Sequence, residues 1–155
     1  MDSSPQIAEV KTDVPRFTRE KLVAGLKNGE FNKITVMTGA GISVAAGIPD
    51  FRSPDTGLYA TLKDYNLPFP EAIFNIEYFR ENPEPFYKLA KEFLDMRKYK
   101  ATYVHHFCKM LKDKGLLAHY LTQNIDNLEM QTGFELKDII QAHGGNHGAK
   151  CAKCG

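Results

Sequence analysis

Apolar positions along this chain follow two different periods, and the change of period separates predicted strands from predicted helices. Short runs of apolar and β-branched residues cover 33–38, 116–122 and 138–142, which is typical of buried strands. Two longer stretches, one opened by Pro85 and one ending at Gly115, space their apolar residues as an amphipathic helix does. The helical apolar positions are Phe86, Leu89, Ala90, Phe93 and Leu94 in the first stretch and Val104, Phe107, Cys108 and Leu111 in the second.

A further helix is predicted near the start of the chain. Thr18 can cap it, Phe17 and Leu22 have the spacing of a hydrophobic staple, and Gly29 follows its last residue, Lys27.

Three other segments carry weaker signals. Leu128 is expected to start a short helix that Gly133 stops. The segment 55–70 mixes proline, glycine and scattered aromatic residues and predicts a loop. Residues 1–16 are polar with two prolines and predict a flexible tail.

The order of the main elements, β-α-α-β-α-β, predicts an α/β fold in which helices wrap a parallel sheet. Ligands of such sheets bind beyond the carboxyl ends of the strands. Segments rich in glycine and polar residues begin just after each predicted strand, at Gly39, Gln123 and His143. We therefore expect these segments to form one common site.

The first of these segments predicts a phosphate-binding turn. Gly39 and Gly41 let the backbone approach a pyrophosphate, and the residues after them can open a helix toward the anion. Val44 stands where the dehydrogenase fingerprint has its third glycine, and no acidic residue lies convincingly about 20 positions further on. An ordinary strand–helix turn is the structural alternative. The residues predicted to hold a nucleotide here are Gly39, Ala40, Gly41, Ile42 and Ser43.

A rigid loop follows the turn. Pro49 stiffens it, and Asp50, Phe51 and Arg52 come directly afterwards. These three residues could line a nucleotide pocket. Alternatively, Phe51 anchors the loop and the two charged residues form a surface ion pair.

The segment after the second strand offers Gln123, Asn124, Ile125 and Asp126. The amides can donate to and accept from ribose hydroxyls, and the carboxylate can accept from a carboxamide. The alternative, which is compatible with the first, is that Asn124 or Asp126 caps the following helix.

Composition narrows the class of protein. The 155 residues are 43% hydrophobic, enough for one modest domain, and the formal net charge of +1 favours neither nucleic acid nor an anionic membrane as the main partner. No apolar run of about 18 residues is present, and the first residues do not match a secretory signal. Three cysteines, two of them as C-x-x-C, indicate a metal pair in a reducing compartment, cytoplasmic or nuclear, rather than disulfides.

Taken together, the motifs resemble the sirtuins, the NAD-dependent protein deacylases. The resemblance rests on 39–43 with 47–53, then Thr122-Gln-Asn-Ile-Asp126, Ala142-His-Gly144 and the C-x-x-C of Cys151 and Cys154, in the family's order. It runs from about Phe31 to the end of the chain, and it implies a Rossmann-like core that binds NAD and takes acylated lysine of proteins as its substrate.

The resemblance also implies roles for single residues. His143 matches the family's general base, which takes a proton from a ribose hydroxyl; an imidazole suits this task near neutral pH. Phe51 and its charged neighbours would line the nicotinamide ribose pocket, and Asp126 would accept from the carboxamide. Cys151 and Cys154 would provide two of the four thiolates of a structural zinc site, the alternative being two free thiols.

The chain departs from the family after His143-Gly144, where Gly145 and Asn146 replace the usual hydroxyl residue and phenylalanine. No arginine lies between Arg52 and Arg80, so an acetyl or apolar acyl group is expected rather than an acidic one. Because only two zinc cysteines are present, we expect a truncated enzyme. Its predicted parts are the N-terminal part of an NAD-binding, Rossmann-like catalytic domain over 17–146 and the truncated start of a zinc module over 147–155.

Two other functions remain open at this stage. A truncated product could be an interaction module that binds NAD without turnover. An NAD-dependent dehydrogenase is the second, against which Val44 and the missing ribose acid argue.

Overall fold

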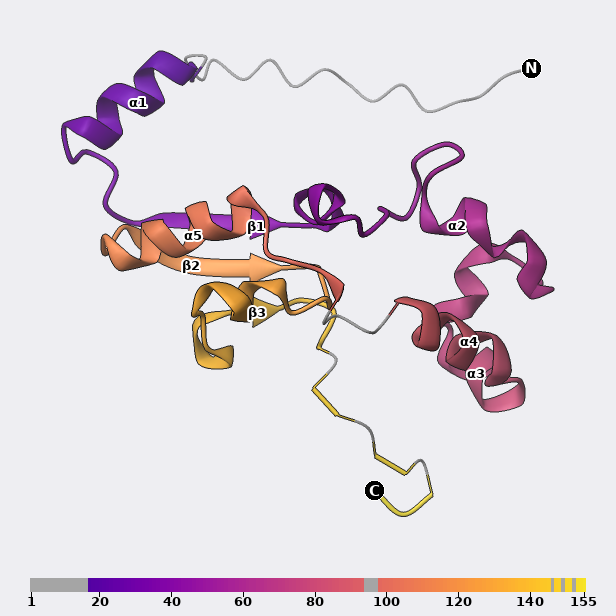
Figure 1. Ribbon diagram of the computed structural model, residues 1–155. Helices are drawn as coiled ribbons and strands as arrows, with labels where there is room; N and C mark the ends of the chain where they lie inside the picture. Colours follow the sequence, from indigo (N-terminus) through magenta and orange to yellow (C-terminus); the bar gives the residue numbers. More distant parts are fainter. Residues whose placement is uncertain (1–16, 94–97, 146, 149, 152) are drawn as a thin grey trace, which may run out of the picture. The chain divides into compact units, whose positions relative to one another are not determined.

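The computed structural model describes residues 17–93, 98–145, 147, 148, 150, 151 and 153–155 (Figure 1). The chain divides into two compact units, Met1–Phe31 and Asn32–Gly155, which we describe separately. The predicted tail at 1–16 lies outside the described residues. No helix in the described ranges is long and apolar enough to cross a membrane.

The first unit contains helix α1, Arg19–Lys27. Thr18 caps it as predicted, since its hydroxyl accepts from the backbone N–H of Lys21 at 3.3 Å. Gly25 lies inside the helix because Phe31 packs there: a Cβ at this position would come within 2.1 Å of the Phe31 ring. Phe17 also packs edge-on against Phe31, with ring centroids 5.7 Å apart.

The second unit is built on the predicted parallel sheet. Strands β1 (Ile34–Thr38), β2 (Leu117–Thr122) and β3 (Ile140–Gln141) pair in that order, and both pairs are parallel. Thr38 pairs with Thr122, which pairs with Gln141, so the three carboxyl ends are level with one another. The strands confirm the prediction, although β3 is shorter than the expected 138–142.

Helix α5, Tyr103–Asp113, packs against β2 (Figure 1). Its buried face consists of His105, Cys108 and Leu111. Val104 and Phe107, which were expected on the core face, are 43% and 51% exposed. That expectation was wrong because hydrophobic spacing cannot distinguish a buried histidine from a polar surface residue.

The core beneath α5 is small and aromatic. It joins Cys108, Tyr120, Phe134 and Ile139, with the rings of Tyr120 and Phe134 5.0 Å apart. Two short 3₁₀ segments, Leu128–Thr132 and Leu136–Asp138, connect β2 to β3 on this side. The first of them is the helix predicted to stop at Gly133, whose φ is +93°.

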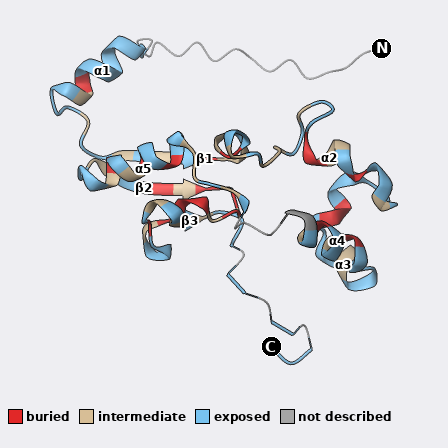
Figure 2. Cartoon of the chain, in the orientation of Figure 1, coloured by how far each residue is buried: buried red, intermediate tan, exposed pale blue. Residues whose placement is uncertain are grey.

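A second core lies between β1 and α5 in the sequence. It is formed by the 3₁₀ segments Leu62–Tyr65 and Pro70–Phe74 and by helices α2 (Leu58–Thr61) and α4 (Glu84–Phe93); helix α3 (Ile76–Glu81) lies between them in the sequence and has no buried residue. Leu58, Leu62, Ile73 and Leu89 form its buried centre (Figure 2). The prediction of a loop over 55–70 was therefore wrong, because packing of widely separated leucines stabilises turns too short to show a helical period.

Candidate functional site

The glycine turn begins where β1 ends. It forms two 3₁₀ turns, Ala40–Ile42 and Val44–Ala46, rather than one continuous helix. A Cβ added at Gly41 would meet nothing within 4 Å, and one added at Gly39 would meet only the Gln123 side chain, at 3.8 Å. The backbone is thus open to a ligand on this side, as a turn that holds a pyrophosphate requires.

Backbone hydrogen bonds continue the sheet one residue past the strands. The N–H of Gln123 donates to the carbonyl of Thr38 at 3.0 Å, and that of Ala142 donates to Thr122 at 2.9 Å. These bonds bring the three polar segments predicted from the sequence to the same edge of the sheet.

A buried polar network, formed by Ser43, Asn124 and Asp126, joins the first two segments. Ser43 donates its hydroxyl to Oδ2 of Asp126 at 2.7 Å, and the Asn124 amide donates to Oγ of Ser43 at 3.2 Å and to the carbonyl of Gly39 at 3.1 Å. All three side chains are buried. Because each bond crosses between the glycine turn and the β2 loop, the network fixes one segment against the other.

Asp126 also stabilises its own loop. Its Oδ1 accepts from the backbone N–H of Leu128 at 3.0 Å, at the start of the following 3₁₀ segment. The N-cap residue of that segment is Asn127, so Asp126 does not occupy the capping position considered from the sequence; it binds the first N–H of the segment from two residues before it. Ile125, between these residues, is half-buried.

His143 lies at the carboxyl end of β3 and is exposed. Its Nδ1 is 2.9 Å from the carbonyl oxygen of Gln123. Since a carbonyl oxygen only accepts, Nδ1 carries a proton, and in the neutral ring the lone pair is then on Nε2. The backbone of the neighbouring loop thus sets the tautomer that a general base needs.

The loop after the glycine turn is held by Asp50. Its two oxygens accept from the backbone N–H of Ser53 at 2.8 Å and from the Ser53 hydroxyl at 2.5 Å, and these bonds lower the pKa of the carboxyl group. The guanidinium carbon Cζ of Arg52 instead lies 6.0 Å from the ring centroid of Tyr59. The proposed Asp50–Arg52 ion pair is thus not what holds this loop.

Phe51 is 38% exposed and contacts two aromatic rings, Tyr59 at 5.8 Å and Phe74 at 5.9 Å between centroids. It is both a loop anchor and an accessible apolar surface.

Cys151 and Cys154 are free and exposed on a tight turn that the Gly155 N–H closes onto the Cys151 carbonyl at 2.9 Å. The backbone N–H groups of Lys153 and Cys154 point at the Cys151 sulfur and lower the pKa of its thiol. Such a thiolate-stabilising turn fits half of a tetrahedral zinc site. Cys108, by contrast, is buried, which raises the pKa of its thiol.

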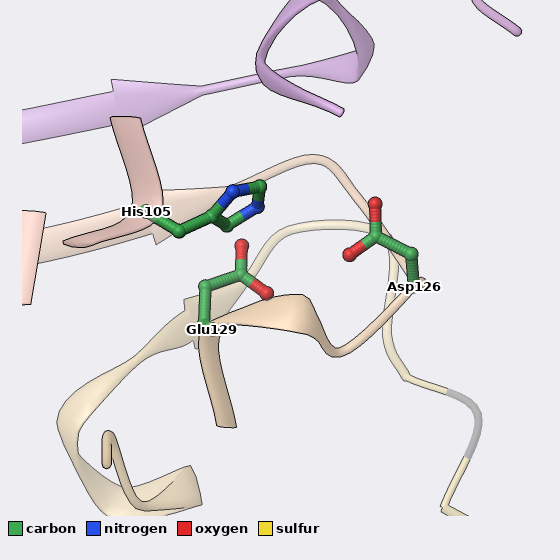
Figure 3. Close-up of side chains that lie close together, drawn as sticks. All are labelled: His105, Asp126 and Glu129. Atoms are coloured by element: carbon green, nitrogen blue, oxygen red, sulfur yellow. The ribbon is translucent and has the colours of Figure 1, made fainter. Parts of the chain in front are cut away.

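Sequence reasoning missed two residues beside Asp126. His105 of α5 and Glu129, three positions after Asp126, are fully buried, and their side chains approach Asp126 closely (Figure 3). Burial lowers the pKa of His105 and raises that of Glu129. The only hint in the sequence was the spacing of His105, Cys108 and Leu111 on one helical face.

Comparison with known proteins identifies the family of this chain. A sequence profile of the Sir2 family matches residues 39–155. The chain belongs to the Sir2 family, so the sirtuin resemblance of its motifs is confirmed.

Individual relatives are similar over most of this chain. The NAD-dependent protein deacetylase hst2 of Schizosaccharomyces pombe is 52% identical over 87% of the chain and 40% of its own length. The NAD-dependent protein deacetylase sirtuin-2 of Danio rerio is 54% identical over 87% of the chain and 35% of its own length. The NAD-dependent protein deacetylase sirtuin-3 of Mus musculus is 43% identical over 90% of the chain and 41% of its own length. The chain therefore spans about two fifths of the length of these relatives.

Proposed function

We propose that the protein acts in NAD-dependent deacylation of protein lysines, with transfer of the acyl group to ADP-ribose and release of nicotinamide. The observation that carries this proposal is the joining of three distant segments at one sheet edge. Ser43 binds Asp126, Asn124 binds Gly39, and His143 binds the Gln123 carbonyl. The names of the similar relatives supply the reaction class.

NAD would supply the ribose carbon to which the acyl oxygen bonds as nicotinamide leaves. The open backbone at 39–43 would receive the diphosphate. Gln123 and Asn124 would bind ribose hydroxyls, and Asp50, Phe51 and Arg52 would line the pocket. Ile125 and Asp126 would face the carboxamide. His143 would accept a ribose hydroxyl proton at Nε2.

For zinc, we propose that Cys151 and Cys154 are two ligands of a structural site in the segment 147–155. The metal would stabilise this segment, and it takes no part in the acyl transfer. His147 is not needed for this role, because its Nε2 lies 2.7 Å from Oε1 of Gln141. Free thiols and thiolate ligands favour a reducing compartment, the cytosol or nucleus.

Acetyl or apolar acyl groups are the expected substrates, since no arginine lies between Arg52 and Arg80 to receive an acidic acyl chain. Phe51, four residues after Gly47, and Phe74 provide an exposed aromatic surface.

The direct test incubates the protein with NAD and an acetyl-lysine peptide and measures free nicotinamide and deacetylated peptide. Equal amounts of both products support the proposal. Tight NAD binding without either product would instead indicate a binding module, and formation of NADH would indicate a dehydrogenase.

A matched pair of variants tests the turn. Gly41→Ala adds a methyl group into open space, so the fold should keep its stability within about 0.5 kcal/mol while NAD affinity falls. Gly148→Ala, which also meets nothing within 4 Å but lies outside the turn, is the control and should leave NAD affinity unchanged.

A further inference from the structure

The segment after His143 departs from the sirtuin pattern at Gly145, and the structure gives a steric reason. Gly145 is not among the glycines with a positive φ, so its backbone conformation does not require a glycine. A Cβ at this position would, however, lie 2.2 Å from Nε2 of His147 and 2.5 Å from Oε1 of Gln141. The space beside Gly145 is therefore taken by the ends of two side chains.

These two side chains are joined by a hydrogen bond. Nε2 of His147 lies 2.7 Å from Oε1 of Gln141, and because an amide oxygen only accepts, Nε2 carries the proton. At its other end the Gln141 amide is oriented consistently, since its Nε2 donates to Oδ1 of Asn127 at 3.1 Å. His147, Gln141 and Asn127 thus form a side-chain bridge between the segment after His143 and the residue that follows Asp126.

Gln141 also binds the backbone of the loop that carries His143. Its carbonyl oxygen accepts from the N–H of Gly144 at 3.1 Å, and the φ of Gly144 is +73°, so the chain turns directly after His143. The chain that follows His143 is thus tied to Gln141 twice, through the backbone of Gly144 and through the side chain of His147. The His143 ring is exposed and has one recorded bond, so its orientation depends on this loop.

We propose that His147 and Gln141 are positioning residues for His143. The side-chain bridge ties the His143 loop to Asn127, and Gly145 leaves the space that the bridge needs. A hydroxyl residue at position 145, which is usual in the family, would push the two side-chain ends away from each other. His147 and Gln141 act through the loop and not on the reacting atoms.

Zinc is the competing partner of His147, which lies four residues before Cys151. A zinc ion bound at Nε2 would need the lone pair of that atom, whereas the bond to Gln141 needs a proton there. The geometry of His147 and Gln141 therefore favours the bridge.

The bridge is tested first, without NAD or substrate. In metal-free protein, nuclear Overhauser contacts should join the ring of His147 and the side-chain amide of Gln141. Absence of these contacts would overturn the proposal. The contacts should persist when Zn²⁺ is added, and their loss on zinc binding would overturn the bridge in favour of a metal ligand.

A matched pair of glycine variants tests the role of Gly145. Gly145→Ala should remove these contacts and leave the protein folded, because the atoms that its methyl group meets are the ends of flexible side chains. Gly148→Ala is the control, since its Cβ meets nothing within 4 Å, and it should keep the contacts. Persistence of the contacts in Gly145→Ala would overturn the steric role of this glycine.

Stability measurements test the same point independently. Gly145→Ala and His147→Ala each remove the bridge, so each should lower the equilibrium constant for folding about twofold to tenfold, the contribution of one hydrogen bond. Since both variants break one interaction, the double variant should be about as stable as the less stable single variant. Effects that simply multiply would overturn the bridge.

The positioning role rests on the proposed function and is tested last. His147→Ala should lower kcat for an acetyl-lysine peptide about twofold to tenfold and leave KM for NAD unchanged, because the bridge supports the loop of the base and not the glycine turn. His147→Gln, whose amide can donate to Gln141 in the same way, should keep the kcat of the parent. Equal kcat for His147→Ala and the parent, or a loss that His147→Gln does not restore, would overturn the positioning role.

Failure of the parent protein itself to deacetylate the peptide would overturn the proposed function, and the positioning role with it. The ring contacts and the folding equilibria would then still decide whether the bridge between His147 and Gln141 exists.

Discussion

Two groups of residues predicted from the sequence differ in what holds their side chains. In the buried polar network, Ser43, Asn124 and Asp126 are bound by one another and by the backbone. In contrast, His143 at the end of β3 and the two cysteines near the end of the chain, Cys151 and Cys154, are exposed, and His143 has one recorded bond, to a carbonyl. The first group is organised before any ligand arrives, whereas the second keeps free the atoms that its chemistry requires. Substitutions in the buried network should therefore affect folding, and substitutions among the exposed residues should affect chemistry.

The largest effect is expected at His143. His143→Ala should lower kcat/KM for an acetyl-peptide by about 10²–10⁴-fold, the usual contribution of a general base, while NAD affinity and stability stay as in the parent. His119→Ala, an exposed histidine on β2, is the control and should retain activity. Activity of His143→Ala within a few fold of the parent would reject its assignment as the base.

Substitutions of buried residues near the network should change the stability of the protein instead. Leu128 is fully buried and follows the Asp126 loop directly. Leu128→Ala should therefore lower the free energy of unfolding of the protein by about 2–5 kcal/mol. Leu136→Ala, at a side chain that is 50% exposed, should change stability by less than about 0.5 kcal/mol. Similar denaturant midpoints for the two variants would contradict the difference in burial on which the comparison depends.

Asp126 combines both kinds of role and sharpens the comparison. Asp126→Asn keeps the shape and an oxygen for the Leu128 N–H but removes the charge. Nicotinamide inhibition and base exchange should weaken by about 1.5–3 kcal/mol, the value of a hydrogen bond to a charged group, and NAD affinity should fall less. Circular dichroism controls for folding. An unchanged inhibition constant for nicotinamide would leave Asp126 with only its structural role in the loop.

The smallest effect is expected among the cysteines in metal-free protein. Cys151 is exposed and its thiol has a lowered pKa, whereas Cys108 is buried and its thiol has a raised pKa. At any given pH, a larger fraction of Cys151 than of Cys108 is therefore ionised to the thiolate. Iodoacetamide should therefore modify Cys151 faster than Cys108, because the Cys151 thiol is both exposed and more readily ionised. The difference should disappear in denaturant, and added Zn²⁺ should protect Cys151. Equal rates in the folded protein would contradict the contrast between the two environments.

The sequence by itself determined the elements whose signal is local. Strands β1 and β2, the Thr18 cap and the stop at Gly133 were predicted, because hydrophobic period and capping chemistry act over a few residues. The convergence of the motifs at 39–43, 123–126 and 143 could also be predicted, since parallel strands bring their carboxyl ends to one edge. Family membership followed from the same motifs.

Only the tertiary structure decided the rest. Helix α2 and the 3₁₀ segments Leu62–Tyr65 and Pro70–Phe74 form over short stretches because Leu58, Leu62 and Ile73 meet Leu89 in a core that no local period shows. Likewise, His105 and Glu129 look like ordinary polar residues until packing removes them from water beside Asp126. A polar side chain gains a role when it is desolvated among particular neighbours, and those neighbours are distant in the sequence.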